Sequence, residues 1–410
     1  MHQDKLARLL FPLFALCLFS LSLGQFSVIY KFNEGSIYLF DILIAVFDFI
    51  GILYLLAMKK VIKIPLPIFF LIAFCALGAI SLIFTPLNLE PTEFLTSASY
   101  LMRFFSYVLF ALVTWNLVKL RIFQVDKIHL IIIFTGLVLF VIGLFQLAVL
   151  PDLETLDPLL GWDPHKNRMA STFFDPNFLG MYFTICLAVS TGMRSVIART
   201  GATKQSLFGR RLYPLSSLIF LAGIFLTFSR SAWLATSVLL FFTLLRKKLL
   251  LLVSLAIVLL AIFAVPRVQT RISGITDPQD SASFRLISWQ NTWEIAKDNW
   301  VFGVGYNAFR YAQKEYGFLN DSSLIARSGA GSDSSLLLVL ATTGVFGLIF
   351  FAGFFIVVLM RTVKTRDVIT VGLISALTID SLFINSLFYP QIIIVALVVL
   401  TCNSRTYSAK

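Results

Sequence analysis

The chain consists mainly of apolar runs long enough to cross a lipid bilayer. Hydrophobic residues make up 58% of the sequence, charged residues 13%, and the mean hydropathy is +0.89. A compact soluble domain could not hide this much apolar surface, whereas a helix of about 20 apolar residues spans the hydrocarbon core of a membrane. The sequence therefore predicts an all-α, polytopic integral membrane protein.

We expect about twelve such transmembrane helices. Their approximate limits are Leu9–Gly24, Ser36–Met58, Pro65–Phe84, Phe94–Val118, Leu130–Leu150, Phe178–Val196, Leu212–Phe228, Ser231–Leu245, Leu249–Val265, Gly344–Met360, Val368–Phe388 and Gln391–Cys402. This division predicts one membrane domain, with the first nine transmembrane helices in residues 1–265, an extracytoplasmic lid loop in residues 266–333, and the last three helices in residues 334–410.

Basic residues gather at one side of the predicted helices. Lys and Arg beside membrane helices favour the cytoplasm, which predicts cytoplasmic termini. Most of the 33 Lys and Arg residues then lie on the cytoplasmic side, with only three acids, Asp4, Asp126 and Asp367. The net charge of +12 therefore reflects membrane topology. We expect no nucleic-acid partner, because no soluble basic domain is available to bind one.

The cysteine and histidine patterns indicate neither disulfides nor a metal site. All four cysteines fall within predicted helices, and the three histidines form no zinc-binding spacing. The GVGYNAF segment resembles half of a dinucleotide fingerprint, but no strand precedes it and we place it outside the cytoplasm. We therefore expect no cofactor. We also expect the first apolar run to be a retained helix, because it lacks a clear cleavage site.

Two predicted outward segments are too long to be simple turns. Pro151–Asn177 ends in NRMASTFFDPN just before a helix, and Pro266–Asp333 is charged but nearly neutral, as expected for a folded lid. The second segment contains apolar residues at approximately helical spacing, which predicts an amphipathic helix with Trp at the membrane interface. The residues of this apolar face are Ile287, Trp289 or Gln290, Trp293, Ile295 and Ala296.

Several motifs together resemble the O-antigen ligase and polymerase-like superfamily. They are DPNFLG before one helix, TFSRSAW between two helices, FRLISWQNTWEIAKDNWVFGVGYNAF in the long outer loop, and DSSLLLVLATTGVFGLIFF after it. The resemblance covers Arg168–Met360 by motif and the whole chain by helix count. It implies a GT-C-like membrane enzyme in the bacterial inner (cytoplasmic) membrane. Such an enzyme transfers a glycan from an undecaprenyl-diphosphate donor to an acceptor hydroxyl, without a nucleotide sugar or bound metal.

Two arginines match the positions where the family binds the donor diphosphate. Arg230 lies in TFSRSAW at the outer junction of two helices, and Arg285 begins the Trp-rich segment. A leaving diphosphate develops negative charge, which arginines held in a water-poor site can stabilise. The structural alternatives are an interfacial arginine that reaches toward the membrane surface for Arg230 and an ordinary exposed loop residue for Arg285.

Asp333 marks a departure from the ligases of this superfamily. Counting back from Thr343–Gly344, the ligases characteristically carry a His followed by Asn where this chain has Asp333–Ser334. The missing His favours the polymerase or exopolysaccharide branch. Asp333 could deprotonate or orient the acceptor hydroxyl, and the structural alternative is that it caps a helix that begins at Ser334.

Arg103 lies within an apolar run, where an unpaired cation is costly. Asp41 and Asp48 are seven residues apart, so both lie on one face of the second helix and either could pair with it. Arg103 is therefore either part of a structural bridge between helices or a contact of the donor phosphate. Asp380 is another intramembrane acid, to which the sequence assigns no role.

Further polar and aromatic residues are candidates for contacts with the substrate. In the family the DPNFLG segment lines the outer cavity, which suggests roles for Arg168, Asp175 and Asn177, although Asp175 and Asn177 also suit a helix start. His165 and Lys166 could bind phosphate or belong to a solvated loop. Tryptophans of the lid, and Tyr306 in the GVGYNAF turn, could stack on sugars or anchor to lipid. The tryptophans are Trp289, Trp293 and Trp300.

The sequence therefore predicts a glycosyltransferase that polymerises undecaprenyl-diphosphate-linked repeat units of O-antigen, capsule or exopolysaccharide. Its partners would be the lipid-linked glycan, an acceptor glycan or lipid, membrane lipids, and a chain-length regulator or flippase. The alternatives are an O-antigen ligase that transfers to lipid A-core or protein, a membrane transporter or flippase, a peptidoglycan polymerase and a membrane scaffold. We detect no internal repeat of the kind that transporters often contain.

Overall fold

We describe a computed structural model of the chain, for residues 2–32, 35–156, 165–200, 205–245, 249, 252, 268–269, 281–319 and 331–402. Helices form most of this structure. In the first part of the chain they are α1 (His2–Ser20), α2 (Leu39–Ala57), α3 (Leu66–Ile83), α4 (Pro91–Lys119), α5 (Val125–Val149), α6 (Pro176–Thr200), α7 (Gln205–Leu226) and α8 (Arg230–Leu244). In the second part they are α11 (Ser281–Asp298), α12 (Phe309–Glu315), α14 (Ser335–Lys364), α15 (Val368–Phe383) and α16 (Pro390–Cys402). Short 3-10 helices are η1 (Leu21–Ser27), η2 (Leu153–Thr155), η4 (Ser171–Phe173) and η7 (Ser386–Phe388).

The helices confirm an all-α, multi-pass membrane protein. Within the described residues, six segments are long and apolar enough to cross a membrane: Leu9–Ser27, Leu39–Ala57, Leu66–Ile83, Pro91–Lys119, Val125–Val149 and Ser335–Lys364. Four shorter apolar helices accompany them, over Arg211–Leu226, Arg230–Leu244, Val368–Phe383 and Pro390–Cys402. The expected run Leu249–Val265 lies outside the described residues except for Leu249 and Leu252, while each of the others overlaps a helix. The count of twelve spans stays a prediction.

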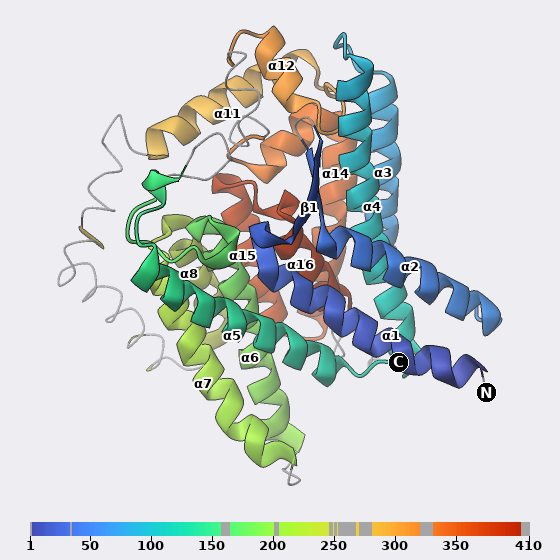
Figure 1. Ribbon diagram of the computed structural model, residues 1–410, viewed down its shortest axis with the longest axis vertical. Helices are drawn as coiled ribbons and strands as arrows, with labels where there is room; N and C mark the ends of the chain where they lie inside the picture. The colour runs from blue at the N-terminus through green and yellow to red at the C-terminus, as the bar shows by residue number, and fades with distance from the viewer. Residues whose placement is uncertain are drawn as a thin grey trace.

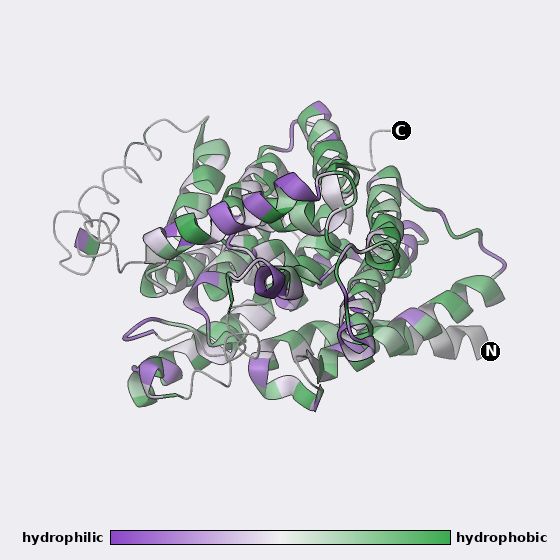
Figure 2. Cartoon of the chain, turned by 90° about the horizontal axis from the view of Figure 1, so that it is seen from above, coloured by the Kyte–Doolittle hydropathy of each residue, from purple (hydrophilic) through white to green (hydrophobic). Residues whose placement is uncertain are grey.

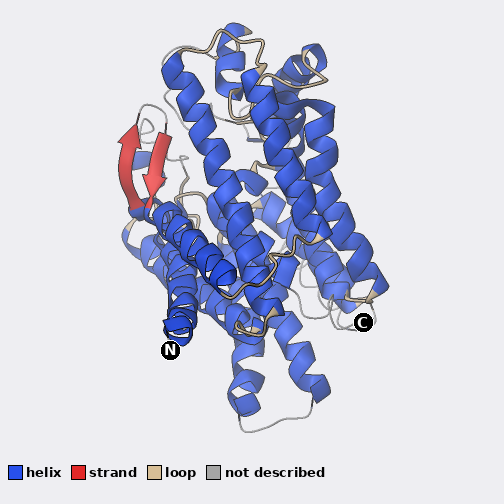
Figure 3. Cartoon of the chain, turned by 90° about the vertical axis from the view of Figure 1, so that its right-hand side faces the viewer, coloured by secondary structure: helices blue, strands red, loops and turns tan. Residues whose placement is uncertain are grey.

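A small β-hairpin forms the one β-sheet within the described ranges. Strands β1 (Val28–Phe32) and β2 (Gly35–Tyr38) pair antiparallel, with Tyr30 opposite Ile37 and Lys31 opposite Ser36. Figure 3 shows the hairpin at one side of the bundle, between α1 and α2 in the chain. The carbonyl of Ser36 in β2 accepts a hydrogen bond from Arg103.

Helices α3, α4 and α14 run along the long axis of the molecule, whereas α1, α2 and α5 cross it obliquely (Figure 1). Helix α3 packs against α4 and α14, α6 against α7, and α8 against α15. Helix α16 lies in the middle of the bundle (Figure 1), and its residues Gln391–Cys402 are all buried. A helix that is apolar around its whole circumference is expected to be buried on every side. This central helix therefore supports the surrounding helices from within.

The outside of the bundle is strongly apolar, as lipid contact requires. Large exposed side chains include Phe49, Phe134 and Phe145, on α2 and α5. Figure 2 shows apolar residues along most of the helices, with polar residues gathered at a few places. Because lipid tails can cover these side chains, their exposure agrees with a membrane-embedded surface. Reactive groups are therefore expected where the polar residues gather.

The two ends of the bundle carry different elements. Helices α11 and α12 lie at one end, while α6 and α7 extend to the opposite end, where Thr200 and Gln205 terminate them (Figure 1). This arrangement agrees with the expectation that the Arg199–Arg211 region and the Trp-rich lid face opposite sides of the membrane. The assignment of these ends to cytoplasm and exterior remains a prediction.

A break in α14 receives the GVGYNAF turn. Gly344 has a φ of +67°, which interrupts the helical backbone and exposes carbonyl groups that would otherwise bond within the helix. The amides of Val304 and Gly305 donate to the carbonyls of Ala341 and Thr342 at 2.9 and 3.0 Å, and the amide of Val345 donates to the Trp300 carbonyl at 2.8 Å. We call this arrangement the α14 interlock, formed by residues 300–305 and 341–345.

Glycine is required on both sides of the α14 interlock. Gly303 has a φ of +71°, and a Cβ added to it or to Gly344 would overlap backbone atoms of the opposite segment. The hydroxyl of Ser81 in α3 also donates to the Thr342 carbonyl at 2.5 Å. The expected Gly-broken turn is therefore confirmed, and its role in the fold is to dock α11 and α12 onto α14.

Helix α11 confirms the predicted helix in the lid but corrects its buried face. Thr292, Ile295 and Ala296 are buried, whereas Ile287 and Trp293 are exposed. The expected face was right for Ile295 and Ala296 and wrong for Ile287 and Trp293. The contacts of α11 with the segment before α14 are partly polar, so Thr292 occupies an inward position. The outward Trp293 suits the alternative of a tryptophan at the membrane interface.

Candidate polar site at the lid end of the bundle

Arg168 ties the loop before α6 to the junction of α7 and α8. Its buried guanidinium donates from Nε to the Thr227 carbonyl at 2.8 Å and from Nη2 to Asn177 Oδ1 at 3.1 Å. Its Nη1 lies 3.1 Å from His165 Nδ1. The Ser229 hydroxyl donates to the same Asn177 oxygen at 2.8 Å. Arg168 and Asn177, predicted as neighbours in one outer cavity, are therefore brought together.

Asp175 begins α6, as its position before Pro176 predicted. Its Oδ1 accepts hydrogen bonds from the backbone amides of Asn177 at 2.7 Å and Phe178 at 3.4 Å. Such bonds satisfy amides that have no partner in the first turn of a helix. The capping interpretation of Asp175 is thus confirmed. The same capping interaction holds Asn177 where it meets Arg168 and Ser229.

The TFSRSAW motif forms the start of α8. Phe228 adopts a φ of +47°, which turns the chain sharply between α7 and α8. Ser229 caps α8 by accepting a hydrogen bond from the Ala232 amide at 3.4 Å, and Arg230 is the first residue of the helix. A helix start presents amide groups and the positive end of the helix dipole, so Arg230 adds its charge to a place that already favours anions.

Helix α11 holds the segment around Asp333. The indole Nε1 of Trp289 donates to the Asp333 carbonyl at 3.1 Å, and the Asp333 amide donates to Ser288 Oγ at 3.0 Å. Thr292 donates to the Ser332 hydroxyl at 2.8 Å. Trp289 is therefore a structural contact of this segment. These bonds fix the backbone of Asp333 beside α11, which also carries Arg285.

The structure corrects the capping alternative for Asp333. Helix α14 begins at Ser335, and its cap is Ser334, whose Oγ accepts a hydrogen bond from the Leu337 amide at 3.4 Å. Asp333 therefore precedes the cap and is not the capping residue. The helix is also longer than the predicted Gly344–Met360 run, because the break at Gly344 lies within it.

Asp380 is the residue that sequence reasoning left without a role. It lies near the end of α15 and is fully buried. Its carboxylate interacts electrostatically with Arg285 and Asp175, and the hydroxyls of Ser231 and Ser386 lie beside it. None of these hydroxyls makes a hydrogen bond of normal geometry with it. Asp380 therefore links the lid helix α11 with the starts of α6 and α8.

The position of Asp380 could not be read from local sequence. It is the single acid in an apolar run, and its neighbours come from parts of the chain as distant as Asp175 and Arg285. The available signal was the cost of an ionisable group inside the membrane, which makes such a residue a functional candidate. The structure supplies the partners that this signal left open.

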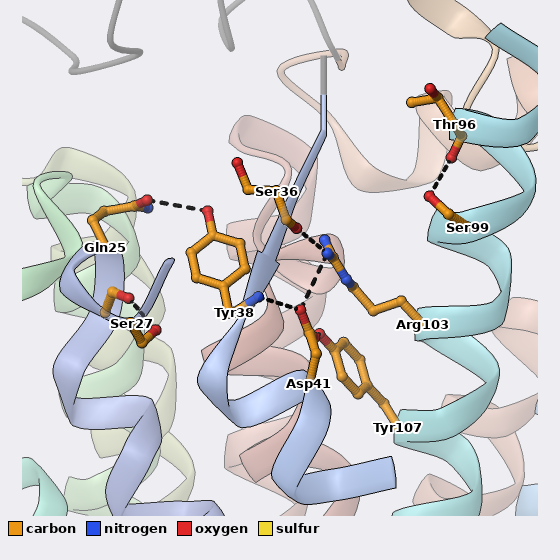
Figure 4. Close-up of polar contacts among 10 residues, drawn as sticks. Gln25, Ser27, Ser36, Tyr38, Asp41, Thr96, Ser99, Arg103 and Tyr107 are labelled. Atoms are coloured by element: carbon orange, nitrogen blue, oxygen red, sulfur yellow. Dashed lines mark hydrogen bonds and ion pairs between the residues drawn. The ribbon is translucent and has the colours of Figure 1, made fainter. Parts of the chain in front are cut away.

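Arg103 belongs to a separate cluster, formed by residues of β2, α2 and α4 (Figure 4). Its Nη2 lies 3.1 Å from Asp41 Oδ2 and also donates to the Ser36 carbonyl. Tyr107 donates to Asp41 Oδ1 at 2.6 Å, and the Tyr38 amide donates to Asp41 Oδ2 at 2.9 Å. We call these five residues the Arg103 cluster. The predicted pairing with an acid of α2 is confirmed for Asp41.

The second acid of α2 makes a different contact. Asp48 Oδ2 accepts a hydrogen bond from Ser106 at 2.9 Å. Asp41 and Asp48 therefore both face α4, as their spacing predicted, but the ion pair of Arg103 is with Asp41. The bridge interpretation of Arg103 is the one that these contacts favour.

Tyr306 and Trp293 lie away from the polar groups described above. Tyr306 is buried and packs against Phe74, Phe104 and Phe388, with ring centroids 6.1, 6.3 and 6.4 Å away. This placement favours a packing role for Tyr306. Trp293 and Trp300 are exposed on the lid, where they can contact membrane lipid.

Lys166 lies in the loop that precedes α6, paired with Asp152 at 3.0 Å. The hydrogen bond from Lys166 lowers the pKa of the Asp152 carboxyl. The solvated-loop interpretation of Lys166 agrees with this exposed pair. Among the residues that the structure describes, no three His, Cys, Asp or Glu side chains gather as metal ligands.

The fold and these contacts define a multi-pass helical membrane protein with a polar site at the lid end. Residues 215–352 match the family model described as O-antigen ligase. The match covers most of α7, all of α8, α11 and α12, and the first half of α14. The resemblance to the O-antigen ligase and polymerase-like superfamily is thereby confirmed. A comparison with curated proteins finds no match.

The family match indicates glycan transfer in polysaccharide biosynthesis, with glycan and lipid-linked substrates. It also covers Arg230, Arg285 and Asp333, together with both halves of the α14 interlock. Arg168, Asp175 and Asp380, which meet this domain in space, lie outside the matched residues. The site is therefore assembled from the matched domain and from helices on both sides of it.

Proposed function

We propose that the protein polymerises undecaprenyl-diphosphate-linked oligosaccharide repeat units at the outer face of the bacterial cytoplasmic membrane. The observation that supports this proposal is that the three segments carrying Arg230, Arg285 and Asp333 are linked at the lid end of the bundle through Asp380 and Ser288. Arg230 precedes Ser231, which lies beside Asp380, and Asp380 interacts with Arg285. Asp333 is fixed to the same helix as Arg285 through Ser288.

In the proposed reaction, a hydroxyl oxygen of the acceptor sugar attacks the anomeric carbon of the donor glycan. A new carbon–oxygen bond forms, and the bond between that carbon and the diphosphate oxygen breaks. The lipid diphosphate leaves with the bonding electron pair, and the guanidinium groups of Arg230 and Arg285 stabilise its charge. The hydroxyl proton passes to the carboxylate of Asp333. No nucleotide sugar takes part.

Asp333 favours a polymerase over a ligase. It occupies the place where ligases carry a His, and it does not serve as the cap of α14. In a polymerase the acceptor hydroxyl belongs to a second lipid-linked glycan. The alternative is an O-antigen ligase that uses lipid A-core or protein as acceptor, and the description of the matching family supports it.

We assign the parts of the chain accordingly. The lid of residues 266–333 would close over the site from outside, with both termini in the cytoplasm. Arg168, Asp175 and Asn177 would shape the wall of the cavity, while Arg103 and Tyr306 would serve the packing of the bundle. A chain-length regulator or a flippase would act on the product or deliver the donor.

Purified protein in lipid nanodiscs tests the proposal. The protein would receive only its lipid-linked repeat unit, isolated from the host strain. A polymerase builds a ladder of longer lipid-linked products, which gel electrophoresis resolves. A donor that stays unextended, but is transferred once lipid A-core or protein is added, would establish the ligase instead.

A further inference from the structure

A group of buried oxygens without partners lies between α15 and α16. Within the described residues, both carboxylate oxygens of Asp380, Oδ1 of Asn385, Oγ of Ser386 and Oε1 of Gln391 make no hydrogen bond of normal geometry, although the hydroxyl of Ser386 lies beside Asp380. Asp380 and Ser386 are fully buried, and Gln391 is 2% exposed. We call these four residues the Asp380 cluster. Buried polar atoms in folded proteins are nearly always paired, so these oxygens are candidates for contacts with a bound polar molecule.

The chemistry of these oxygens restricts the ligand. A carboxylate and the carbonyl oxygens of two amides accept hydrogen bonds and donate none, while the hydroxyl of Ser386 can do either. A phosphate group at neutral pH presents acceptor oxygens, so it matches the Asp380 cluster poorly. A sugar presents several hydroxyl donors and matches it well. The Asp380 cluster is therefore suited to a glycan rather than to a diphosphate.

The surroundings place this cluster beside the proposed reaction. Asp380 interacts with Arg285, and Ser231 follows Arg230 directly. The segment that holds the cluster is also attached to the start of α14, because Ser334 donates to the Ser381 carbonyl and the Leu387 amide donates to Ser335 Oγ, at 3.3 and 3.2 Å. Asp333 immediately precedes these serines. The cluster thus adjoins both the arginines and Asp333.

We propose that the Asp380 cluster binds hydroxyl groups of the acceptor sugar and so determines which hydroxyl faces the donor. This inference rests on the proposed glycosyl transfer. It divides the site into two halves of opposite character: Arg230 and Arg285 attract the donor diphosphate, and the oxygens of the Asp380 cluster receive the acceptor. The negative charge of the Asp380 carboxylate also orients the guanidinium of Arg285.

Kinetics with separate donor and acceptor test this inference. The acceptor would be the repeat-unit oligosaccharide on an alkyl group, which lacks diphosphate and therefore can only accept. Ser386→Ala should raise the KM for this acceptor about tenfold and leave the KM for the lipid-diphosphate donor unchanged, because one hydrogen bond to the acceptor is lost. Asp380→Asn should raise the acceptor KM further, since an amide replaces a charged acceptor of hydrogen bonds.

Ser381→Ala is the matched control. Ser381, on α15, is as buried as Ser386, but its hydroxyl donates to the Thr378 carbonyl. Its acceptor KM should equal that of the unaltered protein. A rise in the donor KM, with the acceptor KM unchanged in Ser386→Ala, would overturn the inference while leaving the proposed transfer intact. Loss of transfer in EDTA and its recovery with Mg²⁺ would also overturn it, because the oxygens would then hold a cation. Failure of the unaltered protein to transfer to any acceptor would instead refute the proposed function.

Discussion

Arg103 and Arg285 each face a carboxylate within the bundle, but their surroundings differ. Arg103 contacts Asp41 and the Ser36 carbonyl, and the oxygens of Asp41 are occupied by Tyr107 and the Tyr38 amide. Arg285 interacts with Asp380, whose two oxygens have no hydrogen-bond partner among the described residues. A buried polar group without a partner costs free energy, which a protein retains where a ligand compensates for it.

The difference between these clusters suggests how to separate structural charges from functional ones in this membrane protein. The polar groups of the Arg103 cluster are paired with one another in the folded chain, so its geometry does not indicate a bound substrate. In the proposed site, the oxygens around Asp380 receive their hydrogen bonds from the acceptor sugar. Substitutions of the residues in the Arg103 cluster and of those around Asp380 distinguish an effect on stability from an effect on glycan transfer.

The largest effect is expected at the arginines of the lid end. Arg285→Ala and Arg230→Ala should each reduce the rate of transfer roughly 100- to 1,000-fold, because each removes a positioned positive group from the leaving diphosphate. Lys should restore only part of the rate, since an ammonium lacks the two-pronged geometry of guanidinium. Product formation by purified variants measures this. Transfer at a normal rate by both Ala variants would contradict the site.

Asp333→Asn should reduce the rate about 100-fold if Asp333 accepts the proton. The amide keeps the size of the side chain but is a very weak base. Because Ser334 rather than Asp333 caps α14, the abundance and thermal stability of the variant should stay unchanged. Rate and melting temperature are measured on one preparation. A fall in both together would indicate a structural role for Asp333.

Gly344→Ala should destabilise the protein by about 1–3 kcal/mol through backbone strain alone, with the overlap in the α14 interlock adding to it. Gly344 has a φ of +67°, and a Cβ there meets the Val301 carbonyl. Gly317→Ala is the control, because Gly317 has a φ of +73° and nothing within 4 Å of an added Cβ. Thermal denaturation compares them. Equal losses would show that the close approach in the interlock contributes nothing.

The smallest effect is expected at Lys166. This residue is exposed and pairs with Asp152 on the surface, so Lys166→Ala should change the transfer rate by less than about twofold. Loss of the hydrogen bond should let the pKa of Asp152 rise toward its ordinary value, and the small stability that the pair provides is the part lost as pH falls. A large loss of transfer at neutral pH would mean that Lys166 contacts the donor.

The sequence predicts the helical fold well because lipid imposes a simple rule on length and hydropathy. Runs such as Pro65–Phe84 and Leu130–Leu150 fall closely on α3 and α5. The buried face of α11 was harder to predict, because Thr292 turns inward to bond Ser332 while Trp293 faces outward. A hydrophobic pattern does not reveal a polar contact between distant segments.

The candidate site was likewise predictable from the sequence only in part. Motif matching selected Arg230, Arg285 and Asp333, and the spacing of acids on α2 gave the partner of Arg103. Neither method could give Asp380 its neighbours, because Asp175, Ser231 and Arg285 meet it only after α6, α8, α11 and α15 pack. Nor could either method show that the GVGYNAF turn enters a break in α14, since this requires the helix to be interrupted at Gly344.

The most direct test neutralises both charge pairs and compares the results. Arg103→Met with Asp41→Asn removes the pair of the Arg103 cluster, and Arg285→Met with Asp380→Asn removes the pair at the lid end. Replacing a buried ion pair by neutral residues is often tolerated by the fold. Normalised to folded protein in nanodiscs, the first double variant should retain transfer within about threefold, and the second should lose at least roughly 100-fold. Near-normal transfer by the second variant, or an equal loss in both, would contradict the account.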